Sequence, residues 1–270
     1  MSDLTPDAST PLSSAVDSSA SLTAEQLLGA DTCRRLGIFQ LPRDFVLTVV
    51  IPCYNEQDTV REVIDRLRDT RLPCELVLVD DGSTDGTREV LRQLEDSADV
   101  KVVYHERNQG KGAALRTGFL HATGDVVVVQ DADLEYDPRD LRYLLQPIME
   151  GVADVVYGSR FSGPDRHVAP LWHLAANTLI TRLFSLRHGW RFTDVETCYK
   201  MFRRSVIQQI APQLRERRFG IELEMTARAL RIPGIRFVER PISYVRRTFA
   251  QGKKIGWRDG IAALWCICRY

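Results

Sequence analysis

The sequence predicts an α/β fold, in which a mostly parallel sheet is sandwiched by helices and followed by a C-terminal amphipathic helical region. Apolar runs rich in Val, Leu and Ile alternate with helical patterns between residues 45 and 158. Such strands are buried on both faces, as in a parallel sheet whose strands are joined through helices. The chain has 270 residues, 44% of them hydrophobic, which suffices for one large α/β domain or two small ones.

The predicted strands are the short runs in which β-branched and other apolar residues predominate. They span residues 45–51, 75–79, 100–105, 125–130 and 154–158. Between them, apolar residues recur with helical spacing, which predicts helices over 58–69, 84–94, 112–122 and 138–151. A short helix near 24–36 precedes the first strand. Right-handed crossovers then place the carboxyl ends of these strands along one edge of the sheet.

From about residue 161 the regular alternation stops. The pattern predicts an amphipathic helix over 170–188, a helix over 220–230 and strands near 235–244. The stretch 199–202 is mixed and is not assigned to either class. A last helix over 257–268 places five side chains on one face: Trp257, Ile261, Leu264, Trp265 and Cys268.

The N-terminal residues, the lengths of the apolar runs and the cysteines indicate in which cellular compartment the protein is expected. Residues 1–24 are rich in Ser, Ala, Thr and Asp without Lys, Arg or aromatic residues, which predicts a disordered tail rather than a signal peptide. Residues 25–270 are then expected to form a single domain. No run of 18 apolar residues occurs, so no membrane span is predicted. The 6 cysteines are scattered without zinc spacing, which favours a reduced, cytoplasmic setting.

Net charge is zero, which gives no reason to expect nucleic acid as a partner. The charges are nevertheless uneven, because residues 1–100 hold 19 acidic and 9 basic side chains whereas residues 231–270 hold 2 and 9. The basic C-terminal end favours an anionic partner there, such as phosphate or a lipid surface. Alternatively, these charges only solvate a surface.

The run of four valines at 126–129 leads into Asp131 and Asp133, two carboxylates one residue apart. Alternate residues of a strand point to the same side, so both carboxylates are expected to converge beyond its carboxyl end, where ligands of α/β sheets bind. Oxygen ligands without His or Cys suit Mg²⁺ or Mn²⁺, which complete their coordination with substrate phosphates and water. The same spacing also occurs in solvated turns.

Two further motifs follow neighbouring strands. In residues 80–87 (DDGSTDGT), Gly82 and the following polar residues suit a tight turn and a helix start, whereas Asp80 ends an apolar strand and is predicted to accept hydrogen bonds from a nucleobase. Residues 108–112 (NQGKG) lack the spacing of a phosphate-binding loop. We interpret them as a glycine-assisted helix start that brings Lys111 near the site.

Together these motifs resemble the GT-A (Rossmann-like) glycosyltransferases of family two, and more narrowly the dolichyl-phosphate mannose synthase and polyprenyl-phosphate glycosyltransferase branch. The resemblance covers about residues 47–257. It rests on Pro52-x-Tyr54-Asn55-Glu56, the 80–87 and 108–112 motifs, Asp131-Ala132-Asp133, Gly158-Ser159-Arg160-Phe161, Thr197-Cys198-Tyr199-Lys200, and Arg247 with Lys253. It divides the domain into a nucleotide-binding half, 45–160, and an acceptor half, 161–270.

The resemblance also implies roles for individual residues. The nucleoside is expected against Pro52, Tyr54, Glu56, Leu78 and Asp80. Asp131 and Asp133 would bind the metal, with Ala132 and Glu135 beside them. Asp133 and Arg160 are the expected catalytic residues, and Arg160, Arg247 and Lys253 would contact diphosphate or acceptor phosphate. The sequence departs from the family pattern at Cys198, where many relatives have Gly, and at Gln130, where others have an apolar residue.

The expected reaction moves a hexose from a GDP- or UDP-sugar to a polyprenyl phosphate, with inversion, at the cytoplasmic face of a membrane that the enzyme contacts peripherally. A phosphate acceptor is already ionised at neutral pH and needs no general base. A hydroxyl of a soluble or polysaccharide acceptor would need one, for which Asp194, Glu222 and Glu224 are candidates. Two competing interpretations are a sugar-1-phosphate nucleotidyltransferase and a non-catalytic binding module.

Overall fold

The computed structural model describes residues 24–35, 37–163, 171–246 and 257–270, and the chain separates into two compact units, 1–39 and 40–270. Most of the predicted tail therefore lies outside the described residues. The described part of the first unit contains α1 (Ala24–Leu28) and α2 (Ala30–Arg35). Gly29 has a φ of 79° and separates them, so the helix predicted near 24–36 is broken in two.

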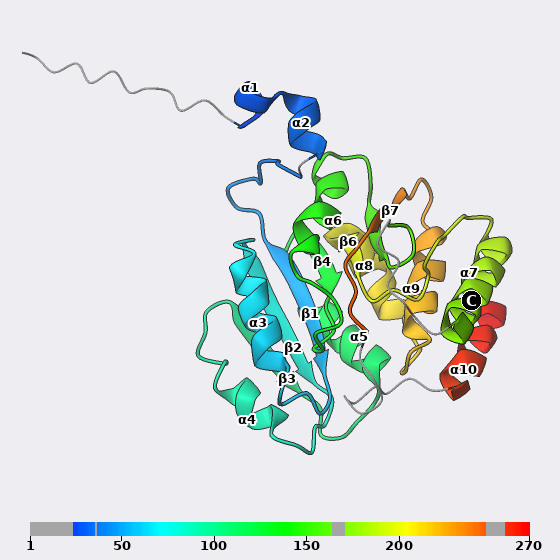
Figure 1. Ribbon diagram of the computed structural model, residues 1–270. Coiled ribbons are helices and arrows are strands. Elements are labelled where there is room, and N and C mark those ends of the chain that lie inside the picture. Colours follow the sequence, from blue (N-terminus) through cyan, green and yellow to red (C-terminus); the bar gives the residue numbers. More distant parts are fainter. Residues whose placement is uncertain (1–23, 36, 164–170, 247–256) are drawn as a thin grey trace, which may run out of the picture. The chain divides into compact units, whose positions relative to one another are not determined.

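The second unit is built on a seven-stranded sheet that helices flank (Figure 1). The strand order is β3-β2-β1-β4-β6-β5-β7, and β6 alone runs antiparallel to its neighbours. The mostly parallel sheet predicted from the apolar runs is thereby confirmed. The strands are β1 (Leu47–Cys53), β2 (Cys74–Asp80), β3 (Val100–Tyr104), β4 (Val126–Val129), β5 (Val155–Ser159), β6 (Lys200–Arg203) and β7 (Phe237–Pro241).

The predicted helices are present, with small shifts at their ends. The largest shift is at α4, which begins at Thr87 instead of 84 because Ser83 and Asp85 are engaged in the preceding turn. The helices of this unit are α3 (Val60–Asp69), α4 (Thr87–Arg92), α5 (Lys111–His121), α6 (Asp140–Met149), α7 (Leu171–His188), α8 (Arg204–Ile210), α9 (Ile221–Leu230) and α10 (Trp257–Arg269), with a 3₁₀ helix η1 (Ala211–Gln213).

The strand order reverses between β1 and β4. The chain runs from β1 outward to β2 and β3, and then returns through α5 to β4 on the other side of β1. In open α/β sheets ligands bind at such a reversal, outside the carboxyl ends of the strands. Here β1 ends at Cys53 and β4 at Val129, so the loops that carry Tyr54 and Asp131 meet at this point.

Strand β6 occupies the stretch that the sequence left unassigned. It pairs with β4 through Met201 and Phe202, and with β5 through the same residues on its other edge. Met201 and Phe202 are fully buried. Because β6 runs in the opposite direction, the residues just before it, including Cys198 and Tyr199, lie at the edge where β4 and β5 end.

The C-terminal helices form a second hydrophobic core beside the sheet. Buried side chains of α7, α9 and α10, among them Phe184, Leu223 and Ile267, pack into one cluster. Both helices therefore bury one face within the protein, and in α10 the buried face is not the predicted one, because Ile261 and Trp265 are exposed. Helix α9 also carries Glu222, which pairs with Lys111 at the start of α5.

Candidate active site

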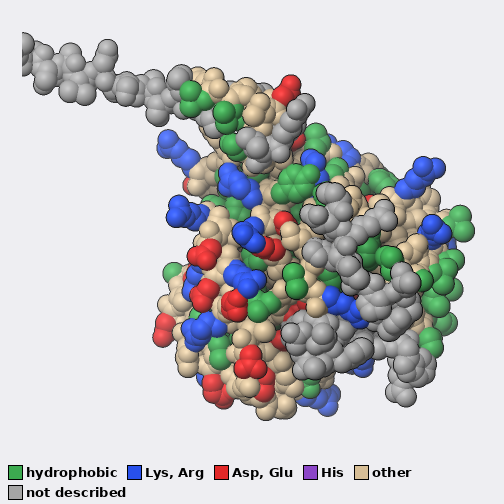
Figure 2. All heavy atoms as spheres, in the orientation of Figure 1, with side chains coloured by type: hydrophobic (Ala, Val, Ile, Leu, Met, Phe, Trp, Pro, Cys, Tyr) green, Lys and Arg blue, Asp and Glu red, His purple; other side chains and the backbone are tan. Residues whose placement is uncertain are grey.

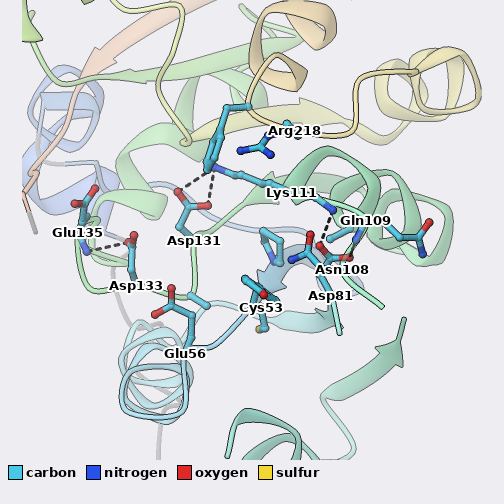
Figure 3. Close-up of a pocket in the computed structure, with 16 residues that line it drawn as sticks. Cys53, Glu56, Asp81, Asn108, Gln109, Lys111, Asp131, Asp133, Glu135 and Arg218 are labelled. Atoms are coloured by element: carbon cyan, nitrogen blue, oxygen red, sulfur yellow. Dashed lines mark hydrogen bonds and ion pairs between the residues drawn. The ribbon is translucent and has the colours of Figure 1, made fainter. Parts of the chain in front are cut away.

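A pocket lies at the reversal of strand order between β1 and β4 (Figure 3). Seven of the predicted site residues line it: Pro52, Tyr54, Glu56, Asp131, Ala132, Asp133 and Glu135. Lys111, which was predicted near the site, lines it too, as do side chains that the sequence analysis left without a site role, among them Asp81, Arg218 and Phe219. The pocket therefore draws on segments from both halves of the chain.

The loop after β1 is fixed by hydrogen bonds to its neighbours. Asn55, with a φ of 53°, donates its backbone N–H to Ser83 Oγ (3.0 Å) and accepts from the Thr84 N–H (2.8 Å) through its side chain. Thr59 Oγ1 donates to the carbonyl oxygen of Ala132 (2.8 Å). The loop is thus tied both to the turn after β2 and to the loop after β4, which holds Tyr54 and Glu56 at the pocket.

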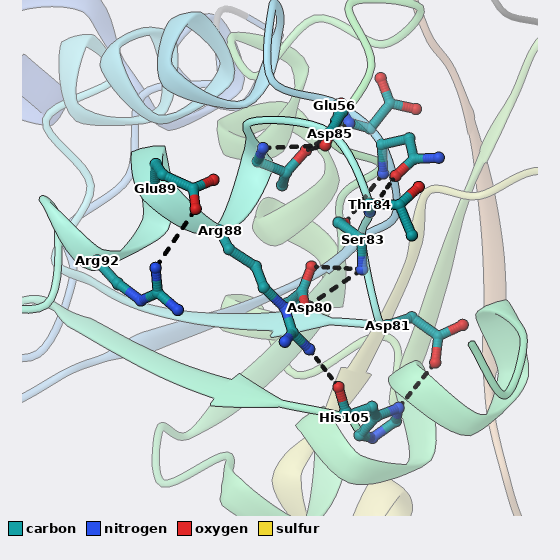
Figure 4. A network of polar contacts seen from close by, with 12 residues as sticks. Glu56, Asp80, Asp81, Ser83, Thr84, Asp85, Arg88, Glu89, Arg92 and His105 are labelled. Carbon is teal, nitrogen blue, oxygen red and sulfur yellow. Dashed lines mark hydrogen bonds and ion pairs between the residues drawn. The ribbon is translucent and has the colours of Figure 1, made fainter. Parts of the chain in front are cut away.

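The two aspartates at the end of β2, Asp80 and Asp81, have different surroundings (Figure 4). Asp80 is fully buried, accepts from Arg88 Nε (2.6 Å) and from the Ser83 N–H (3.2 Å), and is not among the residues that line the pocket. Leu78 is likewise buried within β2 and apart from the lining. Asp81 does line the pocket, although the sequence analysis gave it no role.

Asp81 organises the 108–112 motif. Its carboxylate accepts from the His105 ring (2.8 Å) and from the backbone N–H groups of Gln109 (2.9 Å) and Gly110 (2.7 Å). The N–H groups of Gly112 (2.8 Å) and Ala113 (3.3 Å), in the first turn of α5, donate to the Arg217 carbonyl oxygen. These donors are therefore satisfied within the protein, which confirms the interpretation as a helix start rather than a phosphate loop.

The loop after β4 presents the two predicted metal ligands to the pocket. Asp133 accepts from the Glu135 N–H (3.1 Å). Gln130 accepts from the Tyr199 hydroxyl (2.5 Å) and donates to the Asp131 carbonyl oxygen (3.1 Å), so it links this loop to the segment before β6. This link gives a structural reason for a polar residue at a position where an apolar one is usual.

The donor set suits an ion that the protein holds only in part. Asp131 and Asp133 both line the pocket, and within the described ranges no group of three His, Cys, Asp or Glu side chains forms a closed metal cage. Mg²⁺, and by the same chemistry Mn²⁺, binds through one or two carboxylates and takes its other ligands from substrate phosphates and water. The residues present therefore fit the divalent ion that the sequence predicts.

Lys111 lies between two acidic side chains. Its Nζ is 2.8 Å from Asp131 Oδ1 and 2.9 Å from Glu222 Oε1. Burial acts to lower the pKa of Lys111, but the charges of Asp131 and Glu222 outweigh it and hold the pKa well above its usual value. Lys111 is therefore a fixed positive charge at the wall of the pocket. Glu222 lies 111 positions further along the chain, so sequence spacing gave no sign of this contact.

Arg160, at the end of β5, is held by Asp194. The guanidinium donates to both carboxylate oxygens through Nε (2.7 Å) and Nη2 (2.8 Å), and its carbon lies 5.3 Å from the centre of the Tyr244 ring. Tyr244 in turn donates to Glu135 (2.6 Å), on the loop after β4. Arg160 does not line the pocket itself, but this chain of contacts places it next to the loop after β4.

The remaining predicted site residues, Arg247 and Lys253, lie outside the described residues. Of the three candidate general bases, Asp194 pairs with Arg160 and Glu222 with Lys111. Glu224 accepts from Arg228 Nε (2.8 Å) and from two backbone N–H groups before α9. Each of the three is thus engaged by a cation.

The mostly parallel sheet and the pocket outside the strand ends fit the GT-A fold. The sequence profile described as "Glycosyl transferase family 2" matches residues 48–211. The chain belongs to this family and is a glycosyltransferase. The resemblance noted in the sequence is thereby confirmed, and the interpretations as a nucleotidyltransferase or a binding module are set aside.

Relatives with assigned activities match most of the chain. An undecaprenyl-phosphate mannosyltransferase of Micrococcus luteus is 32% identical over 82% of this chain and 96% of its own. A UDP-N-acetylglucosamine–dolichyl-phosphate N-acetylglucosaminyltransferase of Methanococcus voltae is 28% identical over 65% and 76%. In structure, the chain is similar to glucosyl-3-phosphoglycerate synthase from Mycobacterium tuberculosis in complex with Mn²⁺, UDP-glucose and phosphoglyceric acid, with a TM-score of 0.60, 22% identity and coverage of 84% and 80%.

Proposed function

We propose that this glycosyltransferase moves a hexose from a GDP- or UDP-sugar to a polyprenyl phosphate, with inversion at the anomeric carbon. The donor half of the proposal rests on the pocket at the strand reversal, where the loop after β1 and two carboxylates face the same space. Two relatives are named for transfer to a polyprenyl or dolichyl phosphate. The engaged state of Asp194, Glu222 and Glu224 also suits an acceptor that needs no general base.

In this proposal the nucleoside lies against Pro52, Tyr54 and Glu56. Leu78 and Asp80 support this wall without contacting the nucleoside. Asp80 binds Arg88 and the N–H of Ser83, and Ser83 in turn binds Asn55. Asp131 and Asp133 would hold Mg²⁺ or Mn²⁺, which when bound neutralises charge on the departing nucleoside diphosphate.

On the acceptor side, we propose that Arg160 contacts the acceptor phosphate, oriented by its two hydrogen bonds to Asp194. Arg247 and Lys253 are proposed as further phosphate contacts on sequence grounds. An ionised phosphate is itself the nucleophile, so the protein contributes orientation rather than proton abstraction.

We further propose that the enzyme works at the cytoplasmic face of a membrane, with α7 and α10 against the lipid. Among the described residues, no helix is long and apolar enough to cross a bilayer. The two helices nevertheless expose large apolar side chains, which gather over α7 at the right of Figure 2. The exposed apolar face consists of Leu179, Leu183 and Leu186 on α7, and Ile261, Leu264 and Trp265 on α10.

The charges around this face suit an anionic lipid surface. Helix α7 contains no acidic residue, and its exposed arginines, Arg182 and Arg187, flank the leucines. Its inner side reaches Asp194 through Asn177 (3.4 Å). Helix α7 therefore lies between its exposed leucines and the buried carboxylate that holds Arg160.

A panel of nucleotide sugars tests the transfer. Release of nucleoside diphosphate is measured with Mn²⁺ or Mg²⁺, with and without a short-chain polyprenyl phosphate, and the lipid product is identified by mass. We expect release with one donor to depend on the polyprenyl phosphate. Equal release with a water-soluble acceptor, such as a sugar or phosphoglycerate, would instead establish transfer to a soluble acceptor.

A further inference from the structure

Lys111 uses both oxygens of a predicted metal ligand. Its Nζ lies 2.8 Å from Asp131 Oδ1 and 3.1 Å from Asp131 Oδ2, and a third contact joins it to Glu222 Oε1 at 2.9 Å. The two oxygens of one carboxylate lie too close together for separate N–H donors of the same ammonium, so one N–H is shared between them and another faces Glu222. An ion that binds Asp131 therefore competes with Lys111 for the same carboxylate.

Glu222 has an oxygen that can accept the Lys111 N–H once that N–H leaves Asp131. Its other carboxylate oxygen, Oε2, is buried and has no hydrogen-bond partner, and the side chain as a whole is 7% exposed. A buried carboxylate oxygen without a donor is unfavourable, so this atom is prepared to accept one. Glu222 is in the first turn of α9, and Lys111 bridges it to Asp131.

We propose that Lys111 and Glu222 form a positioning pair that controls access of the divalent ion to Asp131. Without the ion, Lys111 neutralises Asp131. When the ion binds, Lys111 leaves Asp131 and keeps its contact with Glu222, whose Oε2 accepts the N–H that Asp131 released. This inference rests on the proposed assignment of the ion to Asp131 and Asp133.

The pair also keeps a positive charge at the pocket after the exchange. Lys111 lines the pocket together with Asp131, and the glycines on either side of it leave no room for other side chains, because a Cβ at Gly110 or Gly112 would overlap the backbone of residues 216–217. The backbone at Lys111 is therefore fixed, and only its side chain exchanges partners. Glu222 confines that side chain to the vicinity of the donor diphosphate.

The test measures Mn²⁺ binding to the whole chain, without nucleotide or lipid, by electron paramagnetic resonance of the free ion. Glu222→Gln keeps the shape but removes the competing charge, so Lys111 stays on Asp131, and we expect at least tenfold weaker Mn²⁺ binding. Lys111→Met removes the competitor, and we expect at least tenfold tighter binding. Glu216→Gln is the matched control, because Glu216 lies near α9 but pairs with Arg269 and Tyr270.

The double variant separates the proposed exchange from a simple loss of negative charge. If Glu222 acts through Lys111, then Glu222→Gln has little effect in the Lys111→Met background. A loss of affinity that persists there overturns the proposal, as does unchanged Mn²⁺ binding by Lys111→Met. If the wild-type chain binds no Mn²⁺ either alone or with a nucleoside diphosphate present, the metal assignment itself fails and this inference with it, whereas a failed search for the lipid acceptor has no bearing on either.

Discussion

Two cations beside the pocket are oriented by buried carboxylates. Arg160 makes a two-point contact with Asp194, whose side chain is fully buried, and Lys111 lies between Asp131 and Glu222. Removing one partner of a buried pair costs about 3–5 kcal/mol, because the other charge is left uncompensated. These residues therefore stay in place before any substrate arrives, which reduces the ordering needed in the transfer step.

At the residue scale, we predict that Asp133→Ala lowers metal-dependent turnover by at least ~100-fold, the magnitude typical of losing one transition-state charge contact. Asp133 lines the pocket at the loop surface, so its removal should leave the melting temperature close to that of the wild type. Turnover with a titrated metal and circular dichroism are the measurements. Asp137→Ala is the control, since Asp137 pairs with the exposed Arg139. Full turnover by Asp133→Ala, or in excess chelator, would remove the metal assignment.

A second residue-scale prediction concerns pH. Burial, with smaller contributions from Asp194 and Glu222, raises the pKa of Glu196 to about 7, although Arg160 acts to lower it. A carboxyl group whose pKa is raised by folding favours the unfolded chain once the pH exceeds its unfolded value, and this cost grows until the folded pKa is passed. Stability should therefore fall by about 2 kcal/mol between pH 5 and pH 8 on account of this group.

Urea unfolding of Glu196→Gln measures that contribution. The variant should be more stable than the wild type at pH 8, and the difference should shrink towards pH 5. Glu62→Gln, on the exposed side of α3, is a suitable control because its side chain is 50% exposed. A pH-independent difference between Glu196→Gln and the wild type would show that Glu196 is ionised in the folded protein throughout.

At the element scale, the first turn of α5 packs against the segment 215–219, which precedes α9. Its first turn donates to the Arg217 carbonyl oxygen, and Gly110 has a φ of 97° where that carbonyl approaches. Gly110→Ala combines a strained backbone with overlap, whereas Gly151→Ala, at a φ of 70° with open space around it, has the strain alone. We expect Gly151→Ala to cost about 1–2 kcal/mol and Gly110→Ala clearly more. Similar values from urea unfolding would mean that the 215–219 segment moves away freely.

The sequence predicted the elements that a local pattern specifies. The valine run of β4 and the apolar runs of β1 and β2 are buried on both faces, so their composition alone identifies them. Strand β6 was not recognised, because it is four residues long and begins with Lys200. That lysine is fully buried, donates to the Val195 carbonyl oxygen (2.7 Å) and lies 3.9 Å from the centre of the Tyr157 ring. Neither contact is visible in the sequence around it.

The same limit applies to the site. Asp131 and Asp133 were predicted because they follow a strand at the edge where ligands bind, and Pro52, Tyr54 and Glu56 because their motif resembles that of the family; all five line the pocket. The sequence did not predict that Asp81 lines the pocket and Asp80 does not, because the two residues are adjacent at the end of one strand. Only their partners distinguish them: Arg88 for Asp80 and His105 for Asp81. Contacts between distant segments have no local periodicity to reveal them.

At the scale of the whole molecule, we predict binding to anionic vesicles through the apolar face of α7 and α10. Leu186 is 82% exposed and Trp265 is 65% exposed, so replacing both with Ser removes apolar contact area without disturbing the core. Flotation with anionic liposomes should fall by roughly tenfold or more for the double variant, and should fall with salt for the wild type.

Leu120→Ser is the matched control, because Leu120 is 65% exposed on α5, outside this face. Its flotation should equal that of the wild type. Equal flotation by the Leu186→Ser/Trp265→Ser variant, or none by the wild type with any lipid composition, would mean that this face has another occupant. Transfer to a lipid acceptor in detergent should be unaffected by these surface changes.

The direction of β6 bears on how such an enzyme can acquire new specificities. Neighbouring strands lie ~4.8 Å apart, so one intervening strand separates the ends of β4 and β5 by roughly 10 Å, about the width of a hexose ring with its hydroxyls. The loop after β4 and the loop that carries Arg160 therefore belong to strands that do not touch, and Tyr244 connects them through its contacts with Glu135 and Arg160. Under the proposed function, mutations in either loop that keep the contacts of Tyr244 can change donor or acceptor preference separately in descendants of one ancestral chain.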